Sequence, residues 1–282
     1  MKCLYLPLLV LFACFLNANP NQQVLDNSEN YTFKETSSID LKIYVFKPDD
    51  WKASDKNPAI VFYFGGGWNA RHITQFVAYA QYYASKGYVC FIPNYRVRST
   101  ENSQAIDSVR DAQDAFAYVR KNANQFGIDR NRIAASGGSA GGHLAASLGT
   151  LKDEKHKKLS KPNALILFNP VCVVDPLKNP KRFNFARLGV KGHEISPYHN
   201  VDESVPPTII YHGTEDRLVP YKTAEMFHEK MLEVGNDSTL IPFEGRDHGF
   251  FNHGKHLAES DYHKTLKYTD AFLSRMGWSE IE

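Results

Sequence analysis

The most regular feature of the chain is an alternation between short apolar runs and longer stretches with helical spacing. Apolar runs bounded by turn residues indicate buried strands, whereas apolar residues recurring every three or four positions indicate amphipathic helices. These patterns predict strands at residues 31–34, 41–46, 59–64, 88–93, 133–135, 164–168, 208–211 and 239–243. They predict helices at 73–86, 103–126, 221–234 and 260–276, and another directly after Gly141.

The first two expected strands differ from the later ones. Leu41, Ile43 and Val45 alternate with polar positions, as in an antiparallel pair, whereas the later runs are continuously apolar, as in strands covered on both faces. This alternation predicts an α/β fold with a mostly parallel central sheet and helices on both faces. Ligands of such sheets bind beyond the carboxyl ends of the strands. Loops after Phe64, Ser136, Tyr211 and Phe243 are expected to share that edge.

One domain accounts for most of the chain. A length of 282 residues suits a single α/β domain, which is expected to span residues 30–282. Residues 174–205 lack clear periodicity and contain several prolines, so they are expected to form a short insertion, or cap.

The N-terminal residues predict export. Lys2 precedes an apolar run over residues 4–16, which is too short to span a bilayer comfortably and is typical of a signal segment, here residues 1–18. The stretch that ends at Cys14 loosely resembles a bacterial lipobox, which predicts a lipid anchor on Cys14. Cleavage after Ala18 is the alternative. The protein is therefore expected to be periplasmic, secreted or lipid-anchored.

Charge and cysteine content exclude several classes of function. The net charge of +2 with mixed signs has no nucleic-acid footprint. Outside the leader, Cys90 and Cys172 follow or lie in apolar runs, so they are expected to be buried thiols, although a disulfide stays open. No cysteine pair has metal-ligand spacing, and neither a metal nor a cofactor is expected.

Chemistry is concentrated in Gly137-x-Ser139-x-Gly141, which lies between an expected strand and an expected helix. A strand that reverses sharply into a helix strains its turn residue and needs small neighbours. The pattern therefore predicts a nucleophile elbow with Ser139 as the nucleophile. Ser136 is the nearest alternative, but it lies before the turn, inside the strand.

Several motifs, taken in order, resemble the α/β-hydrolase superfamily, and more narrowly the esterase branch related to hormone-sensitive lipase and small acetyl esterases. The resemblance covers nearly all of residues 30–276. The motifs are Phe64-Gly65-Gly66-Gly67-Trp68, Asn94-Tyr95-Arg96, the elbow, His212-Gly213-Thr214-Glu215-Asp216, and Asp247-His248-Gly249-Phe250.

The resemblance and the strand-end positions together predict a Ser-His-Asp triad. Ser139 needs an imidazole to take its proton and a carboxylate to orient that imidazole. His248 is the expected base, with His253 as the best alternative, and Asp216 is the expected acid. Glu215 is expected to point elsewhere, and Asp247 is too close to His248 in the backbone to orient it.

Backbone N–H groups are expected to form the oxyanion hole, from Ala140 after the nucleophile and from Gly66 or Gly67. The family motif usually begins with histidine, and this chain has Phe64 there, which can only pack. Trp68 is expected either to line the acyl or alcohol pocket or to pack in the core.

These features predict an exported serine carboxylester hydrolase that works through an acyl-enzyme on short acyl esters. The resemblance implies small-molecule or carbohydrate esters, with acetyl or feruloyl groups, as substrates. One alternative is an arylformamidase-like amide hydrolase or a peptidase of the prolyl oligopeptidase type. Another is a non-catalytic binding protein on the same fold.

Overall fold

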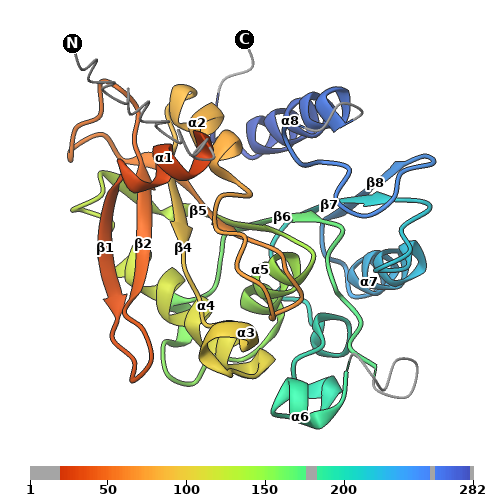
Figure 1. Ribbon diagram of the computed structural model, residues 1–282. Helices are drawn as coiled ribbons and strands as arrows, with labels where there is room; N and C mark the ends of the chain where they lie inside the picture. Colours follow the sequence, from red (N-terminus) through yellow and green to blue (C-terminus); the bar gives the residue numbers. More distant parts are fainter. Residues whose placement is uncertain (1–19, 176–182, 255–257, 280–282) are drawn as a thin grey trace, which may run out of the picture.

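An eight-stranded sheet crosses the molecule in the order β1-β2-β4-β3-β5-β6-β7-β8 (Figure 1). This computed structural model describes residues 20–175, 183–254 and 258–279. The pairs β1–β2 and β2–β4 are antiparallel and the others are parallel, which confirms the predicted sheet and its antiparallel start. The strands are β1 (Glu29–Lys34), β2 (Leu41–Phe46), β3 (Asn57–Tyr63), β4 (Val89–Pro93), β5 (Ile128–Gly138), β6 (Ala164–Phe168), β7 (Thr208–Gly213) and β8 (Ser238–Phe243).

Helices cover both faces of the sheet (Figure 1). One face packs against α4 (Ala105–Lys121), α5 (Ala140–Thr150) and α7 (Tyr221–Glu233). The other packs against α1 (Pro20–Asp26), α2 (Val77–Ser85) and α8 (Ala258–Arg275). The connections contain the short helices α3 (Arg98–Glu101) and α6 (Phe185–Leu188) and the 3-10 turns η1 (Lys157–Leu159), η2 (Gly192–Glu194) and η3 (Pro197–Asn200).

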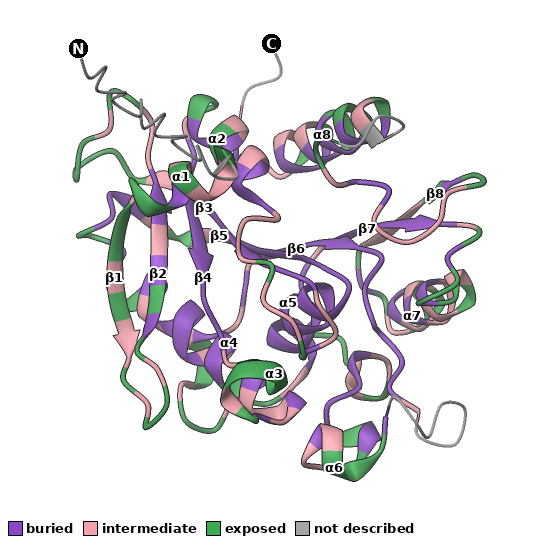
Figure 2. Ribbon diagram, in the orientation of Figure 1, coloured by how far each residue is buried: buried purple, intermediate pink, exposed green. Residues whose placement is uncertain are grey.

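The central strands are buried on both faces because their side chains alternate between two apolar layers (Figure 2). In β3, Val61 and Tyr63 belong to the layer beside α4 and α5, whereas Ile60 and Phe62 belong to the layer beside α2 and α8. This explains the continuous apolar run of the sequence. The edge strands β1 and β8 are only partly buried.

Several element boundaries differ from the predictions. The helix expected at 103–126 begins at Ala105, because Gln104 and Asp107 form a capping box, and ends at Lys121. The helix expected at 73–86 begins only at Val77, after a turn in which the Gln75 N–H donates to the His72 carbonyl. The elbow strand is longer than expected and starts at Ile128.

The folded part of the chain also starts before residue 30. Helix α1 packs beside α2 and buries Leu25 completely. Its seven residues are mostly polar, so the sequence has no periodic signal there. The predicted leader, residues 1–18, lies outside the described residues. None of the helices in the described ranges is long and apolar enough to cross a membrane.

The expected insertion is small where it is described. Residues 174–205 contain only α6, η2 and η3 outside the undescribed segment 176–182. Cys90 and Cys172 are both buried and unpaired, so they are the thiols expected from the apolar runs and not a disulfide.

Candidate active site

Ser139 stands on a sharp turn between β5 and α5. Its backbone has φ 56° and ψ −118°, a region that non-glycine residues rarely adopt. The turn is possible because its neighbours are glycines: a Cβ on Gly141 would lie 2.0 Å from the Tyr63 carbonyl oxygen. The geometry is that of the predicted nucleophile elbow. Ser136, the alternative, is fully buried inside β5.

His248 and Asp216 meet at the carboxyl ends of β8 and β7. The His248 Nδ1–H donates to Asp216 Oδ2 at 2.7 Å. A carboxylate oxygen can only accept, so Nδ1 carries the proton and Nε2 of the neutral ring is free to accept one. The pair thus has the geometry of a general base with its orienting acid.

Asp216 is held as a carboxylate by donors on both of its oxygens. Its Oδ1 accepts the N–H groups of Leu218 and Val219, each at 2.8 Å, and the Nε2 of buried His212 lies 3.4 Å from Oδ2. Burial acts to raise the pKa of Asp216, but the contacts with His212 and His248 and the Val219 N–H outweigh it and hold that pKa well below its usual range. Asp216 therefore stays charged and can stabilise an imidazolium.

The loop after β3 has both aromatic and polar supports. Phe64 stacks on Tyr95 with ring centroids 4.0 Å apart, and the Tyr95 hydroxyl donates to the Phe64 carbonyl at 2.6 Å. Next in the loop, the Gly65 N–H donates to Gln75 Oε1 at 2.6 Å. Phe64 therefore packs, as expected, and its stacking partner is Tyr95.

The same loop brings backbone donors to the nucleophile. Gly66 and Gly67 have φ values of 124° and 63°, and their N–H groups make no hydrogen bond with any other described residue. Ala140 is the first residue of α5, and the first turn of a helix leaves its N–H groups without intrahelical acceptors. These are the donors expected for an oxyanion hole.

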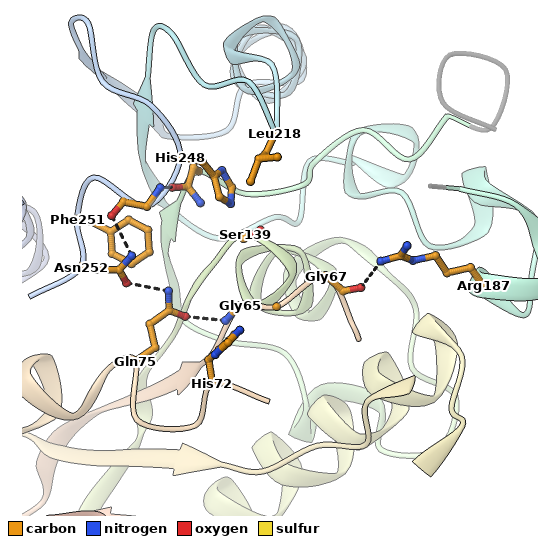
Figure 3. A pocket seen from close by; sticks show the side chains of 13 residues that line it. Gly65, Gly67, His72, Gln75, Ser139, Arg187, Leu218, His248, Phe251 and Asn252 are labelled. Atoms are coloured by element: carbon orange, nitrogen blue, oxygen red, sulfur yellow. Dashed lines mark hydrogen bonds between the residues drawn. The ribbon is translucent and has the colours of Figure 1, made fainter. Parts of the chain in front are cut away.

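Ser139, His248 and the three loop glycines border one cavity of about 470 Å³ (Figure 3). Among the described residues, no hydrogen bond joins the Ser139 hydroxyl to the His248 ring. Catalytic contacts of this kind are often long in a free enzyme and tighten when substrate binds. The remaining lining residues are His72, Gln75, Asn169, Arg187, Leu218, Gly249, Phe251 and Asn252.

Trp68 corrects the expectation of a pocket wall. Its side chain is 2% exposed and packs edge-on against His143, with Phe183 on another side. It does not line the cavity, and its backbone is left-handed (φ 56°) where the chain leaves the glycines. Trp68 is therefore core, the second of the two interpretations.

The other candidates for acid and base lie in different surroundings. Asp247 pairs with Arg217 and accepts the His248 backbone N–H at 2.7 Å. It therefore stabilises the loop after β8 and does not contact the imidazole. Glu215 is exposed. His253 is also partly exposed and lies 3.7 Å from Glu259.

Besides His72, sequence reasoning missed four polar residues that line the cavity. Gln75 links Gly65 to Asn252, because its Nε2 donates to Asn252 Oδ1 at 2.9 Å, and Asn252 donates in turn to the Gly249 carbonyl (Figure 3). Asn169 Oδ1 accepts the Gly249 N–H at 3.1 Å. Arg187 donates to the Gly67 carbonyl at 2.8 Å.

Of these four, only Asn169 had a usable signal. It directly follows β6, and its loop belongs with the other strand ends at this edge. Gln75 and Asn252 lie in irregular segments, and Arg187 lies in the four-residue helix α6, which is too short to give a periodic signal. No cluster of three or more histidine, cysteine, aspartate or glutamate side chains that could hold a metal ion occurs within the described ranges.

Two protein families match different parts of the chain. The BD-FAE family matches residues 41–176, which include Ser139, and the prolyl oligopeptidase family matches residues 183–275, which include Asp216 and His248. Among curated proteins, the chain is 30% identical over 247 residues to an acetylxylan esterase of Xylanibacter ruminicola, covering 81% of this chain and 48% of that protein. It is 27% identical to the esterase LipC of Mycobacterium tuberculosis, over 72% of this chain and 56% of the relative.

The chain thus spans about half the length of these curated relatives. A solved structure, in contrast, matches over nearly the whole length of both chains. Esterase 2 of Thermogutta terrifontis, phosphonylated by sarin, is 40% identical with a TM-score of 0.87, covering 92% of this chain and 98% of that one. The propionate-bound form of the same esterase has a TM-score of 0.85.

Proposed function

Because this chain belongs to the esterase branch of the α/β-hydrolase superfamily, we propose that it is a serine carboxylester hydrolase with Ser139, His248 and Asp216 as its triad. One observation carries the proposal. The strained serine and the carboxylate-bound imidazole border the same cavity as the glycine loop. A binding protein on the same fold would have no need of this combination.

The reaction follows from these positions. His248 Nε2 takes the proton of the Ser139 hydroxyl as Oγ attacks the ester carbonyl carbon. The negative charge that develops on the carbonyl oxygen is stabilised by the N–H groups of Ala140 and of Gly66 or Gly67. His248 then protonates the departing alcohol oxygen, which leaves an acyl-enzyme. A water molecule, deprotonated by His248, attacks the acyl carbon and releases the carboxylic acid and free Ser139.

Short acyl esters of carbohydrates are the proposed substrates. The cavity of about 470 Å³ is open to solvent and is bordered by polar side chains such as His72, Gln75 and Asn252. Such a lining suits a hydroxyl-rich alcohol better than a long acyl chain. The acetylxylan esterase of Xylanibacter ruminicola, as a relative, supports an acetyl ester, and a feruloyl ester is the second substrate of this class.

The nucleophile is tested with Ser139→Ala. Hydrolysis of p-nitrophenyl acetate is expected to disappear, while the melting temperature stays within a few degrees of the wild type, because Ala keeps the packing of the turn. Turnover at the wild-type rate in folded Ser139→Ala enzyme would remove Ser139 from the mechanism.

A covalent label gives a second measurement of the same site. One solved structure of esterase 2 of Thermogutta terrifontis is of the enzyme phosphorylated by paraoxon. Treatment of this protein with paraoxon is expected to add one diethylphosphoryl group to the peptide that contains Ser139. Mass spectrometry of the digested protein locates the group, and Ser139→Ala protein is the control that must stay unlabelled.

Amide or peptide hydrolysis is the second candidate, favoured by the match of residues 183–275 to the prolyl oligopeptidase family. The same triad attacks both kinds of bond. Comparing kcat/KM for acetylated xylan, feruloylated sugars, formylkynurenine and a prolyl p-nitroanilide separates the candidates. A preference for an amide over every ester would replace the ester proposal.

Export is also proposed, on the strength of the apolar run that precedes polar residues 17–22. In a bacterial host, the full-length chain should be processed, and the mass of the mature N-terminus distinguishes its two forms. A lipid on Cys14 gives a membrane-bound product that Cys14→Ser releases, whereas cleavage after Ala18 gives a soluble one. Unprocessed protein that retains Met1 would contradict both.

A further inference from the structure

Arg187 contributes a charged group to the border of the cavity. It belongs to α6 in the insertion, and the Asn184 side chain accepts its backbone N–H at 3.0 Å. Its side chain extends toward the loop after β3, where Nη2 donates to the Gly67 carbonyl at 2.8 Å (Figure 3). The guanidinium therefore lies beside the glycines that face Ser139.

The Gly67 carbonyl is a single neutral acceptor, so most N–H groups of this guanidinium have no hydrogen-bond partner among the described residues. A guanidinium has five N–H donors. The Nε of Arg187 is buried and makes no hydrogen bond, and no carboxylate of the described residues lies within ion-pair distance of the side chain. Burial, with a smaller contribution from Arg98, lowers the pKa of Arg187. A half-buried cation of this kind is stabilised by an anion.

The described part of the cavity wall has no negative charge to pair with this cation. No aspartate or glutamate is among the described lining residues, and the carboxylate of the site, Asp216, is buried and already accepts hydrogen bonds from the protein. Among the described lining residues, Arg187 carries the permanent charge. The electrostatic complement of this cavity is therefore a ligand with a negative group.

We infer that Arg187 is a specificity-determining residue that binds a carboxylate on the ester substrate, away from the scissile bond. Guanidinium groups bind carboxylates through charge-assisted hydrogen bonds, and the Arg187 side chain lies in the wall of the cavity. The inference rests on the proposed esterase function and narrows it to acyl esters with an acidic group, such as esters of acidic sugars.

Matched substrates separate this inference from the function on which it rests. On the alcohol side, 4-acetoxybenzoate is compared with its methyl ester, and on the acyl side, the mono-4-nitrophenyl ester of glutaric acid is compared with its methyl-capped form. Hydrolysis of the neutral esters tests the esterase function alone. In at least one pair, the wild type should prefer the anionic ester by about tenfold or more in kcat/KM.

The decisive quantity is the ratio of anionic to neutral kcat/KM in Arg187→Gln. Loss of the hydrogen bond to the Gly67 carbonyl should lower kcat/KM equally for the anionic and the neutral ester. Loss of a carboxylate site should lower kcat/KM for the anionic ester only. The ratio should therefore fall to about one or below in Arg187→Gln, and Arg187→Lys should keep part of it. Arg98→Gln is the matched control, since Arg98 is exposed and does not line the cavity, and it should keep most of the preference.

Two outcomes would overturn the inference while the esterase proposal stands. One is active wild-type enzyme without preference for the anion in either pair. The other is a preference that Arg187→Gln leaves unchanged. If the wild type hydrolyses none of the four esters, the esterase proposal itself fails.

Discussion

Two aspartates lie beside the imidazole, and only one of them touches its ring. Asp216 accepts the His248 Nδ1–H, whereas Asp247 accepts the backbone N–H of His248 and pairs with Arg217. Asp216→Asn should lower kcat by roughly 10³–10⁴-fold, because an amide neither fixes the tautomer nor stabilises an imidazolium. Asp247→Asn, measured on the same ester, is the matched control and should stay within a few-fold of the wild type. Equal losses in both variants would mean that the loop, and not the ring contact, matters.

Phe64 replaces the histidine usual in this motif with a stacked aromatic pair. Phe64→Ala removes the ring from Tyr95 and should cost about 3–5 kcal/mol of stability, as aromatic truncations in a core do. In protein still folded, kcat should fall more than KM rises, because a loosened loop weakens oxyanion donors that act on the transition state. Tyr95→Phe keeps the stack and removes only the bond to the Phe64 carbonyl, so its loss should be smaller. Folded Phe64→Ala enzyme with wild-type kcat would make Phe64 ordinary core.

At the scale of elements, a hydrogen-bonded chain joins the loop after β3 to the loop after β8. Gln75 accepts the Gly65 N–H and donates to Asn252, which donates to the Gly249 carbonyl beside His248. Gln75→Leu breaks the chain and should lower kcat by roughly tenfold, less than the 10²–10³ lost with an oxyanion donor itself, with little change in KM.

The control for this chain is a double-mutant cycle with Asn252→Ala. If Gln75 and Asn252 act as one unit, the double variant should lose little more kcat than Gln75→Leu alone. Strictly additive losses would mean that the two residues act separately. In that case, Gln75 supports only the glycine loop.

The triad could be predicted from sequence patterns, whereas the hydrogen-bonded chain through Gln75 and Asn252 could not. Strand-end positions placed Ser139, Asp216 and His248 at one edge, because parallel strands align their carboxyl ends. The bridging contacts of Gln75 and Asn252 join residues 177 positions apart through irregular segments, and no period describes such segments. The start of α2 was predicted wrongly for the same reason, because a turn and not a cap decides that this helix begins at Val77. The burial of Trp68 rests on contacts with His143 and Phe183, which are distant in the sequence and which no periodicity predicts.

Across the whole molecule, the site is assembled from loops that follow neighbouring strands of one sheet. Ser139, Asn169, Asp216 and His248 follow four neighbouring strands, β5 to β8. The insertion adds Arg187 from outside the sheet, and the Arg187 side chain donates a hydrogen bond to the Gly67 carbonyl. The chemistry therefore depends on residues held by the sheet, whereas the inferred choice of substrate depends on Arg187 of the insertion.

The stability of the whole fold should respond to acid through Asp114 of α4. This nearly buried carboxylate contacts Lys34 of β1 at 2.6 Å and His156 Nε2 at 2.6 Å, and it also pairs with Lys155. Burial acts to raise the pKa of Asp114, but the bonds from Lys155, Lys34 and His156 outweigh it and lower that pKa to about 2. Since an unfolded aspartate titrates near pH 3.9, the contribution of this group is present above about pH 4 and is lost as the pH falls toward 2.

Asp114→Asn should therefore lower the free energy of unfolding at pH 7 by on the order of 1–2 kcal/mol, a range that allows for the exposed Lys155 partner. Its stability should also fall less steeply than that of the wild type between pH 4 and pH 2, because the titrating group is gone. Urea unfolding at several pH values in this window measures both effects. Asp50→Asn, at an exposed turn, is the matched control and should follow the wild-type curve. Parallel curves for Asp114→Asn and the wild type would show that the ion pairs of Asp114 do not hold β1, α4 and the η1 segment together against acid.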